Sequence, residues 1–430
     1  MSKNATSNKL GLKELIAMGV GGMIGGGIFS VLGLAVDISG HAAPVAFLLG
    51  SVIAFFAGYS YIKLAVTFKS DGASFTYLEH AFPKFPSVAG LVGWSVIIGY
   101  VGTLALYAYT FGAYGAEMLG YSGSTYIRAT LSVLVLLGLM VINLRGVSSS
   151  GITEDLIVYA KIFILAFFGF IGLHSIESVV VTPVFNQGIS SVFVAGALIF
   201  VAFEGFQLIT NEVVETQSPD KNIPRGIYSS IAITSILYIV IAIITVATLT
   251  AVEIRQAEEY ALAVVAEPIL GKGGRILIGI AALLSTSSAI NSTLFGAARM
   301  MAVMAERNNM PPILAKRSLD NTPWVAIMTL TILALLFSTI NTLETIASFS
   351  SLIFLIVCAA VSIANLKLHN LTQCNKTIVM TAIMLISSTI ILLLFHLAKN
   401  DIKTLLWVIS LLFFVTILEV VISRVLKQHD

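Results

Sequence analysis

The sequence Gly19-Val-Gly-Gly-Met-Ile-Gly-Gly-Gly-Ile-Phe-Ser30 lies within the first long apolar stretch of the chain and holds six glycines in nine residues. Small residues are common where membrane helices pack closely against one another. However, residues 25–27 are three glycines in succession, and each glycine weakens a helix by about 1 kcal/mol relative to alanine. We therefore expect the helix to be interrupted at this point.

The rest of the chain is also strongly apolar: of its 430 residues, 57% are hydrophobic and only 11% are charged. A soluble globular protein carries roughly a quarter charged residues. Only helices and closed barrels satisfy their backbone groups inside a bilayer. Barrel strands alternate apolar and polar residues over about ten positions, whereas the apolar runs here, such as residues 227–249, are continuous. The sequence therefore predicts an all-α integral membrane protein.

One crossing takes about 20 apolar residues, which predicts twelve membrane helices joined by short loops, without a separate soluble domain. They are expected at residues 12–36, 42–66, 88–119, 126–144, 152–174, 190–213, 226–250, 272–304, 323–340, 343–366, 376–397 and 403–424. An even number places both termini on one side. Seventeen of the 24 lysines and arginines fall on that side and six on the other, which leaves Lys161 inside the membrane. The positive-inside rule then predicts a multi-pass plasma-membrane protein with cytoplasmic termini.

A second interruption is expected in the sixth predicted helix, where Phe200-Val-Ala-Phe-Glu-Gly-Phe-Gln207 carries a Glu–Gly pair. The first and sixth helices would open two five-helix halves, residues 12–174 and 190–366, followed by two helices at 376–424. Because five is odd, the halves would be inverted repeats. Broken helices at matching positions of inverted repeats indicate a substrate site near the middle of the membrane.

The chemistry of such a break suits an amino acid. An interrupted helix frees N–H groups at the start of one half and carbonyl groups at the end of the other. The N–H groups and the positive end of the helix dipole attract a carboxylate, and the freed carbonyls attract an ammonium group. An α-amino acid carries both charges a few ångströms apart.

Four motifs, in order, resemble signatures of the amino acid–polyamine–organocation (APC) transporter family. They are Gly22-Met-Ile-Gly-Gly-Gly-Ile-Phe29, Phe203-Glu-Gly-Phe206, Glu215-Thr-Gln-Ser-Pro-Asp-Lys-Asn-Ile-Pro-Arg225, and Asn291-Ser-Thr-Leu-Phe-Gly-Ala-Ala-Arg299 with Ala305-Glu-Arg-Asn-Asn-Met-Pro311. The resemblance covers the first ten predicted helices. It implies the bacterial leucine-transporter fold, a 5+5 inverted repeat with broken helices 1 and 6 and two further helices at the C-terminus.

The resemblance also implies the positions of the substrate site. The carboxylate is expected at the backbone of Gly25, Gly26 and Gly27. The amine is expected at the carbonyls near Met23 and Ile24 and at the sixth-helix break, which comprises Phe200, Phe203, Glu204 and Gly205. Many family members have serine or alanine in place of Gly26, so a hydroxyl contact available to some of them is missing here. The Glu204 carboxylate can bind the amine, transfer a proton or brace the broken helix.

Lys161 lies about nine residues into the fifth predicted helix, roughly 14 Å deep at 1.5 Å per residue. Charged residues at this depth are costly and usually face the protein interior. Its position resembles that of the lysine in the proton-coupled, broad-specificity amino acid transporters of the family, where the amine replaces a sodium ion. The matching coupling groups here would be Gly21 or Gly22 and Ser287 or Ser288.

These patterns predict a proton-coupled symporter of neutral α-amino acids. An exchanger of amino acids or polyamines is the nearest alternative, and a non-transporting amino acid sensor is a more distant one. No enzyme activity, metal site or cofactor other than the coupling proton is expected, because the six histidines lack metal-ligand spacing and no phosphate-binding loop is present. The net charge of +2 gives no reason to expect a nucleic-acid partner. The amino acids carried and the oligomeric state stay open.

Overall fold

The computed structural model describes residues 9–70, 73–145, 151–176, 183–318 and 320–426. Within these residues the regular elements are helices, apart from one isolated parallel bridge between Leu10 and Thr216. The α-helices are α1 (Leu12–Met23), α2 (Gly27–Ser39), α3 (Ala43–Phe68), α4 (Ala73–Ala81), α5 (Pro86–Met118), α6 (Thr125–Leu144), α7 (Gly151–Ser175), α8 (Ile189–Leu198), α9 (Leu208–Asn211), α10 (Pro219–Thr248), α11 (Ala251–Gln256), α12 (Ala261–Glu306), α13 (Trp324–Ile340), α14 (Leu343–Lys367), α15 (His369–Thr372), α16 (Lys376–Asn400) and α17 (Ile402–Leu426). Four short 3-10 helices are η1 (Gly40–Ala42), η2 (Ile199–Phe203), η3 (Glu258–Tyr260) and η4 (Pro312–Ala315).

Nine helical segments among the described residues are long and apolar enough to cross a membrane, and two shorter apolar helices, Trp324–Ile340 and Ile402–Ile417, accompany them. The predicted all-helical membrane class is therefore confirmed. The count of twelve crossings stays a prediction, because α1 is only 12 residues long and α2 continues through η1 into α3 as one 42-residue segment.

Both expected interruptions are present. In the first predicted helix, α1 ends at Met23, residues 24–26 form a non-helical turn, and α2 begins at Gly27. In the sixth, α8 ends at Leu198 and tightens into η2, after which residues 204–207 are not helical and α9 follows. The glycine run and the Glu–Gly pair thus mark the two places where these helices break.

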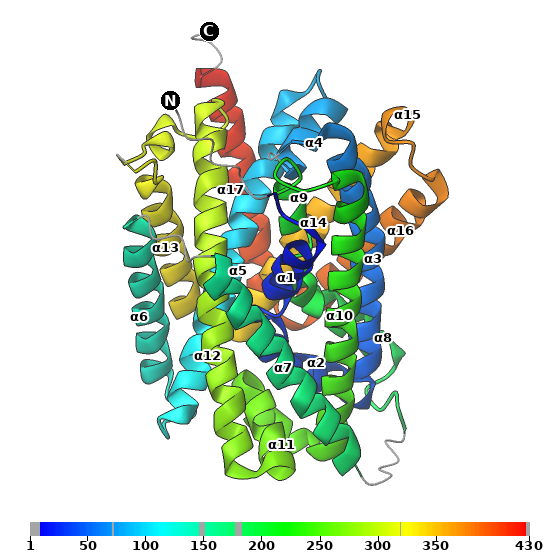
Figure 1. The fold of residues 1–430 in the computed structure, drawn as a ribbon, viewed down its shortest axis with the longest axis vertical. Coiled ribbons are helices and arrows are strands. Elements are labelled where there is room, and N and C mark those ends of the chain that lie inside the picture. The colour runs from blue at the N-terminus through cyan, green and yellow to red at the C-terminus, as the bar shows by residue number, and fades with distance from the viewer. Residues whose placement is uncertain (1–8, 71–72, 146–150, 177–182, 319, 427–430) are drawn as a thin grey trace.

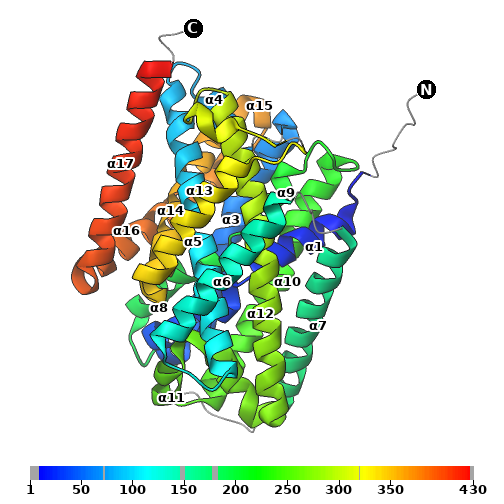
Figure 2. The same cartoon turned by 90° about the vertical axis from the view of Figure 1, so that its left-hand side faces the viewer.

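The helices form one bundle around α5, which packs against α12, α14, α6 and α13. The trailing helix α17 lies at the edge of the bundle in Figure 2 and contacts α5 and α16. Figure 1 shows α4, α15 and the C-terminal end of α17 at one end of the bundle and α11 at the other. We call these ends the terminal side and the α11 side.

Helix α12 bends where the eighth membrane crossing was expected to begin. Pro268 lies within it, and Gly271 has the non-helical dihedral angles φ 68° and ψ −170°. Arg275 spans the bend, with its Nη1 2.5 Å from a Glu267 carboxylate oxygen and its Nε 2.6 Å from one of Glu117 on α5. These ion pairs hold the first turns of α12 against the α11 side of α5.

Candidate functional site

The two interruptions touch each other through their backbones. Gly205 has φ +143°, and a Cβ atom on it would lie 2.6 Å from both the Gly22 carbonyl carbon and the Met23 nitrogen. A Cβ on Gly22 would in turn lie 3.2 Å from the Gly205 Cα. The predicted breaks of helices far apart in the sequence therefore meet at one point.

Hydroxyl groups from the surrounding helices meet the carbonyls that the first break frees. Tyr238 of α10 donates a hydrogen bond to the Met23 carbonyl at 2.7 Å, and its hydroxyl also lies 3.2 Å from the Ala202 carbonyl in the second break. Ser285 of α12 donates to the Ile24 carbonyl at 2.5 Å. Tyr238 thus contacts a carbonyl group of each break, and Ser285 donates to a further carbonyl of the first break.

The three successive glycines leave room for close packing around the start of α2. A Cβ on Gly26 would lie 2.2 Å from the Tyr107 ring, and one on Gly27 would lie 2.8 Å from the Ala202 Cα. A Cβ on Gly25 would meet a side chain of α12 at 2.5 Å. The space that serine or alanine would take at position 26 is filled here by an aromatic ring from α5. The first N–H groups of α2 lie in this crowded region, and such groups have no partner within their own helix.

Glu204 is held by one side chain from α5 and one from the second break itself, and it is only 4% exposed. Thr103 of α5 donates to one carboxylate oxygen at 3.2 Å, and the amide of Gln207 donates to the other at 2.6 Å. The Gln207 side-chain oxygen accepts a hydrogen bond from the Gly205 nitrogen at 3.0 Å. Glu204 therefore braces the break and ties it to α5; its predicted contact with substrate stays a prediction.

The remaining predicted binding residues lie at the same place and are closed off from solvent. Met23, Ile24, Phe200 and Phe203 are each at most 1% exposed. The Phe203 ring packs edge-to-face on Tyr238, with the ring centroids 5.4 Å apart. The structure thus brings the predicted residues of both breaks together and buries them.

Lys161 lies on α7, which packs against α12, α10 and α1. Its side chain is 2% exposed and its Nζ is fully buried. A Cβ on Gly21 would lie 2.7 Å from Val158, one turn before Lys161 on the same helix. The lysine is therefore buried beside the helix that carries the first break.

The two predicted hydroxyl partners of the lysine lie on α12. Ser287 donates to the Leu283 carbonyl of its own helix at 2.7 Å, and Ser288 is half-buried. The hydroxyl that reaches the first break comes instead from Ser285, two residues before Ser287. The coupling roles of Gly21, Gly22, Ser287 and Ser288 stay predictions.

Sequence reasoning missed Tyr238 and Ser285. A tyrosine in an apolar helix carries no sign of its partner 215 residues away. Ser285 belongs to a run of four hydroxyl residues, 285–288, which indicates a polar helix face but not which member points at the break. Within the described residues no group of three or more histidine, cysteine, aspartate or glutamate side chains is placed to hold a metal ion.

Comparison with known proteins shows the family to which the chain belongs. Residues 10–370 match the model of a family described as amino acid permease. An uncharacterized protein of Methanocaldococcus jannaschii is 30% identical, over 98% of this chain and 97% of its own length. The inner membrane transport protein YbaT of Escherichia coli is 26% identical over 99% and 98%, and the serine/threonine exchanger SteT of Bacillus subtilis is 27% identical over 82% of each. The chain therefore belongs to the amino acid permease family of the APC transporters and is a membrane transporter of amino acids, not an enzyme.

Proposed function

We propose that this amino acid transporter is a proton-coupled symporter of neutral α-amino acids and works by alternating access around its two broken helices. The observation that supports the proposal most is the contact between Gly22 and Gly205. It joins the freed backbone groups of both breaks in one place, and such crossings of broken helices form substrate sites in transporters of this architecture.

In this proposal the substrate carboxylate binds the N–H groups at residues 25–27, where α2 begins, and the amine binds the carbonyls of Met23 and Ile24 and of the second break. Tyr238 and Ser285 already donate to the first two carbonyls. A carbonyl oxygen has two lone pairs, so each can accept an ammonium proton while keeping its hydroxyl donor.

Lys161 is proposed to carry the coupling proton. A fully buried ammonium group is costly, and the structure buries the lysine Nζ next to the first break. The amine can therefore take up a proton when the site is open to one side and release it when the site is open to the other. The protonated Lys161 amine would then occupy the position at which a sodium-driven relative binds its ion.

The membrane arrangement belongs to the same proposal. Twelve crossings in two inverted five-helix halves, with the termini in the cytoplasm, place the terminal side inside the cell and the α11 side outside. The positions of α1 and α8 at the starts of the two halves support the repeat, and the distribution of lysine and arginine supports the orientation.

Exchange of one amino acid for another is the second candidate mechanism. It is favoured by the relative from Bacillus subtilis, which is named a serine/threonine exchanger. An exchanger needs a loaded site for each return step, whereas a proton symporter returns empty. The two mechanisms therefore differ in their need for amino acid on the far side.

Uptake into liposomes separates them. Purified protein is reconstituted without sodium, and uptake of labelled alanine, leucine, glutamate and lysine is followed under an inward proton gradient. We expect alanine or leucine uptake that a protonophore abolishes. Uptake that requires liposomes preloaded with amino acid and ignores the protonophore would establish exchange and contradict the proposed symport.

A further inference from the structure

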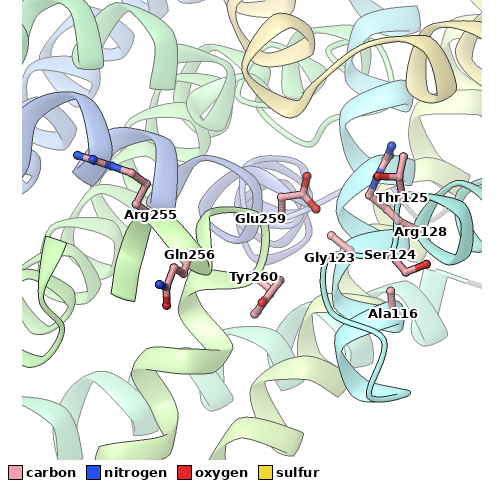
Figure 3. A pocket seen from close by; sticks show the side chains of 10 residues that line it. Ala116, Gly123, Ser124, Thr125, Arg128, Arg255, Gln256, Glu259 and Tyr260 are labelled. Atoms are coloured by element: carbon pink, nitrogen blue, oxygen red, sulfur yellow. The ribbon is translucent and has the colours of Figure 1, made fainter. Parts of the chain in front are cut away.

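A cavity of about 250 Å³ opens on the α11 side of the molecule, outside the residues assigned to the substrate site (Figure 3). Its walls come from the end of α5, the turn into α6, and the segment formed by α11 and η3. A water molecule in the liquid occupies about 30 Å³, so the cavity has room for roughly eight waters or one free amino acid.

A buried guanidinium lines this cavity without a carboxylate partner among the described residues. Arg128 is 6% exposed, and its Cζ lies 3.7 Å from the centroid of the Tyr109 ring. Its hydrogen bond within the described structure is one long contact, 3.5 Å to the Ser338 carbonyl. A buried arginine normally has a carboxylate or several acceptors. Most of its donors are therefore available to an anion in the cavity.

A carboxylate lines the same cavity a short distance away. Glu259 accepts a hydrogen bond from the hydroxyl of Tyr109, the residue on whose ring Arg128 stacks. Tyr109 thus separates the two charges, and no ion pair joins them in the described structure. In Figure 3 Glu259 lies between Arg255 and the start of α6, where Ser124, Thr125 and Arg128 are found.

The remaining polar groups of the cavity wall agree with a positive end at Arg128 and a negative end at Glu259. Ser124 caps the N-terminus of α6 and accepts a hydrogen bond from the Ile127 nitrogen at 3.4 Å, and Thr125 follows it. The N-terminus of a helix carries a partial positive charge, which adds to that of Arg128. Arg255 at the other end of the cavity already pairs with Asp37 of α2 at 2.9 Å. The free positive end therefore lies at Arg128 and the negative end at Glu259.

We propose that this cavity is a second amino acid site, at which a substrate zwitterion binds with its carboxylate on Arg128 and its ammonium on Glu259 before it reaches the broken helices. The inference rests on the proposed orientation, which places the α11 side outside the cell. It does not depend on proton coupling. Tyr109 lies two residues from Tyr107, whose ring covers Gly26, so one helix wall connects the two sites.

Cysteine protection tests the proposal in the full-length protein. Its two native cysteines are replaced, Cys358→Ala and Cys374→Ser, and Gln256→Cys introduces a single thiol on the cavity wall. A mixture of the common L-amino acids other than cysteine, whose own thiol would consume the reagent, should slow the reaction of this thiol with a maleimide. The same mixture in N-acetylated or C-amidated form should not, because each lacks one of the two charges. Val252→Cys, on the same helix, 65% exposed and outside the cavity, should react equally fast with and without amino acids.

Two further variants ask whether the charges act as assigned. Arg128→Gln should abolish protection and raise the KM of uptake by about tenfold, the order expected for the loss of a charge-assisted pair. Glu259→Gln gives the same test at the ammonium end if Arg128→Gln does not fold. Absence of protection at Gln256→Cys, or protection that persists in both charge variants, would overturn the site.

Uptake under a proton gradient, measured on the same preparations, keeps this proposal distinct from the proposed symport. Proton-driven uptake without protection at Gln256→Cys would contradict the second site and leave the symport intact. Protection without proton-driven uptake would support the second site and contradict the symport.

Discussion

The contact between the two broken helices makes Gly205→Ala the most informative single substitution. Its Cβ would lie 2.6 Å from the Gly22 carbonyl carbon and from the Met23 nitrogen, both of which are backbone atoms and cannot rotate away. The dihedral φ +143° is also one that alanine rarely adopts. Such backbone strain costs about 1–3 kcal/mol, and overpacking costs a further ~1–3 kcal/mol. We therefore expect a loss of roughly 2–6 kcal/mol in the free energy of unfolding.

The assay is denaturant unfolding of the purified protein in detergent, with uptake into liposomes measured in parallel. Gly120→Ala controls for strain alone, because Gly120 has φ +80° and no atom lies within 4 Å of the position that its Cβ would take. Gly296→Ala controls for the substitution itself, because this helical glycine also faces open space, and alanine there should stabilise by up to about 1 kcal/mol. If Gly205→Ala lost no more stability than Gly120→Ala and kept wild-type uptake, the two breaks would not be in contact as described.

Two further substitutions test the groups around the breaks. Tyr238→Phe removes the hydroxyl that donates to the Met23 carbonyl. Because a buried acceptor is then left without its donor, the free energy of unfolding in the same assay should fall by about 1–3 kcal/mol. A variant as stable as wild type would show that the hydroxyl is dispensable. Glu204→Gln keeps the size of the side chain, so stability should change by no more than about 1.5 kcal/mol, typical of one hydrogen bond, while uptake should fall and lose part of its pH dependence. Unchanged uptake kinetics and pH dependence would leave Glu204 as a brace only.

The membrane class and the two breaks could be predicted from the sequence because their causes are local. Low charge and continuous apolar runs require helices in a bilayer. Three successive glycines at 25–27 weaken a helix wherever it packs, and the structure ends α1 at Met23, two residues before them. The Glu–Gly pair at 204–205 acts in the same way, since Gly205 takes a φ that other residues avoid.

The partners of the breaks could not be predicted, because they depend on how distant helices pack. Nothing near Tyr238 indicates that its hydroxyl reaches both breaks. Which of the four adjacent hydroxyl residues faces the first break depends on the rotation of α12 about its own axis, and in the structure it is Ser285. A predicted helix boundary that is uncertain by a few residues does not determine this rotation.

The cavity that Arg128 and Glu259 line could not be predicted from the sequence either. In the sequence Arg128 counts only as a charge near the end of a predicted helix on the outer side. In the structure it is buried on the ring of Tyr109, in a cavity that also includes Glu259 from a segment 131 positions later in the chain. Charge counting predicts on which side such residues lie, but it cannot predict which of them share a pocket.

Lys161→Gln is the sharpest test of the proposed proton coupling, because it removes the proton carrier while keeping a polar side chain of similar length beside the first break. Liposomes without sodium are given an inward proton gradient, and initial uptake of alanine and leucine is compared with that of wild type, as is amino acid exchange without a gradient. We expect that proton-driven uptake is lost and that exchange between amino acids on the two sides persists. Proton-driven uptake at the wild-type rate in Lys161→Gln would contradict the assignment of Lys161 as the proton carrier.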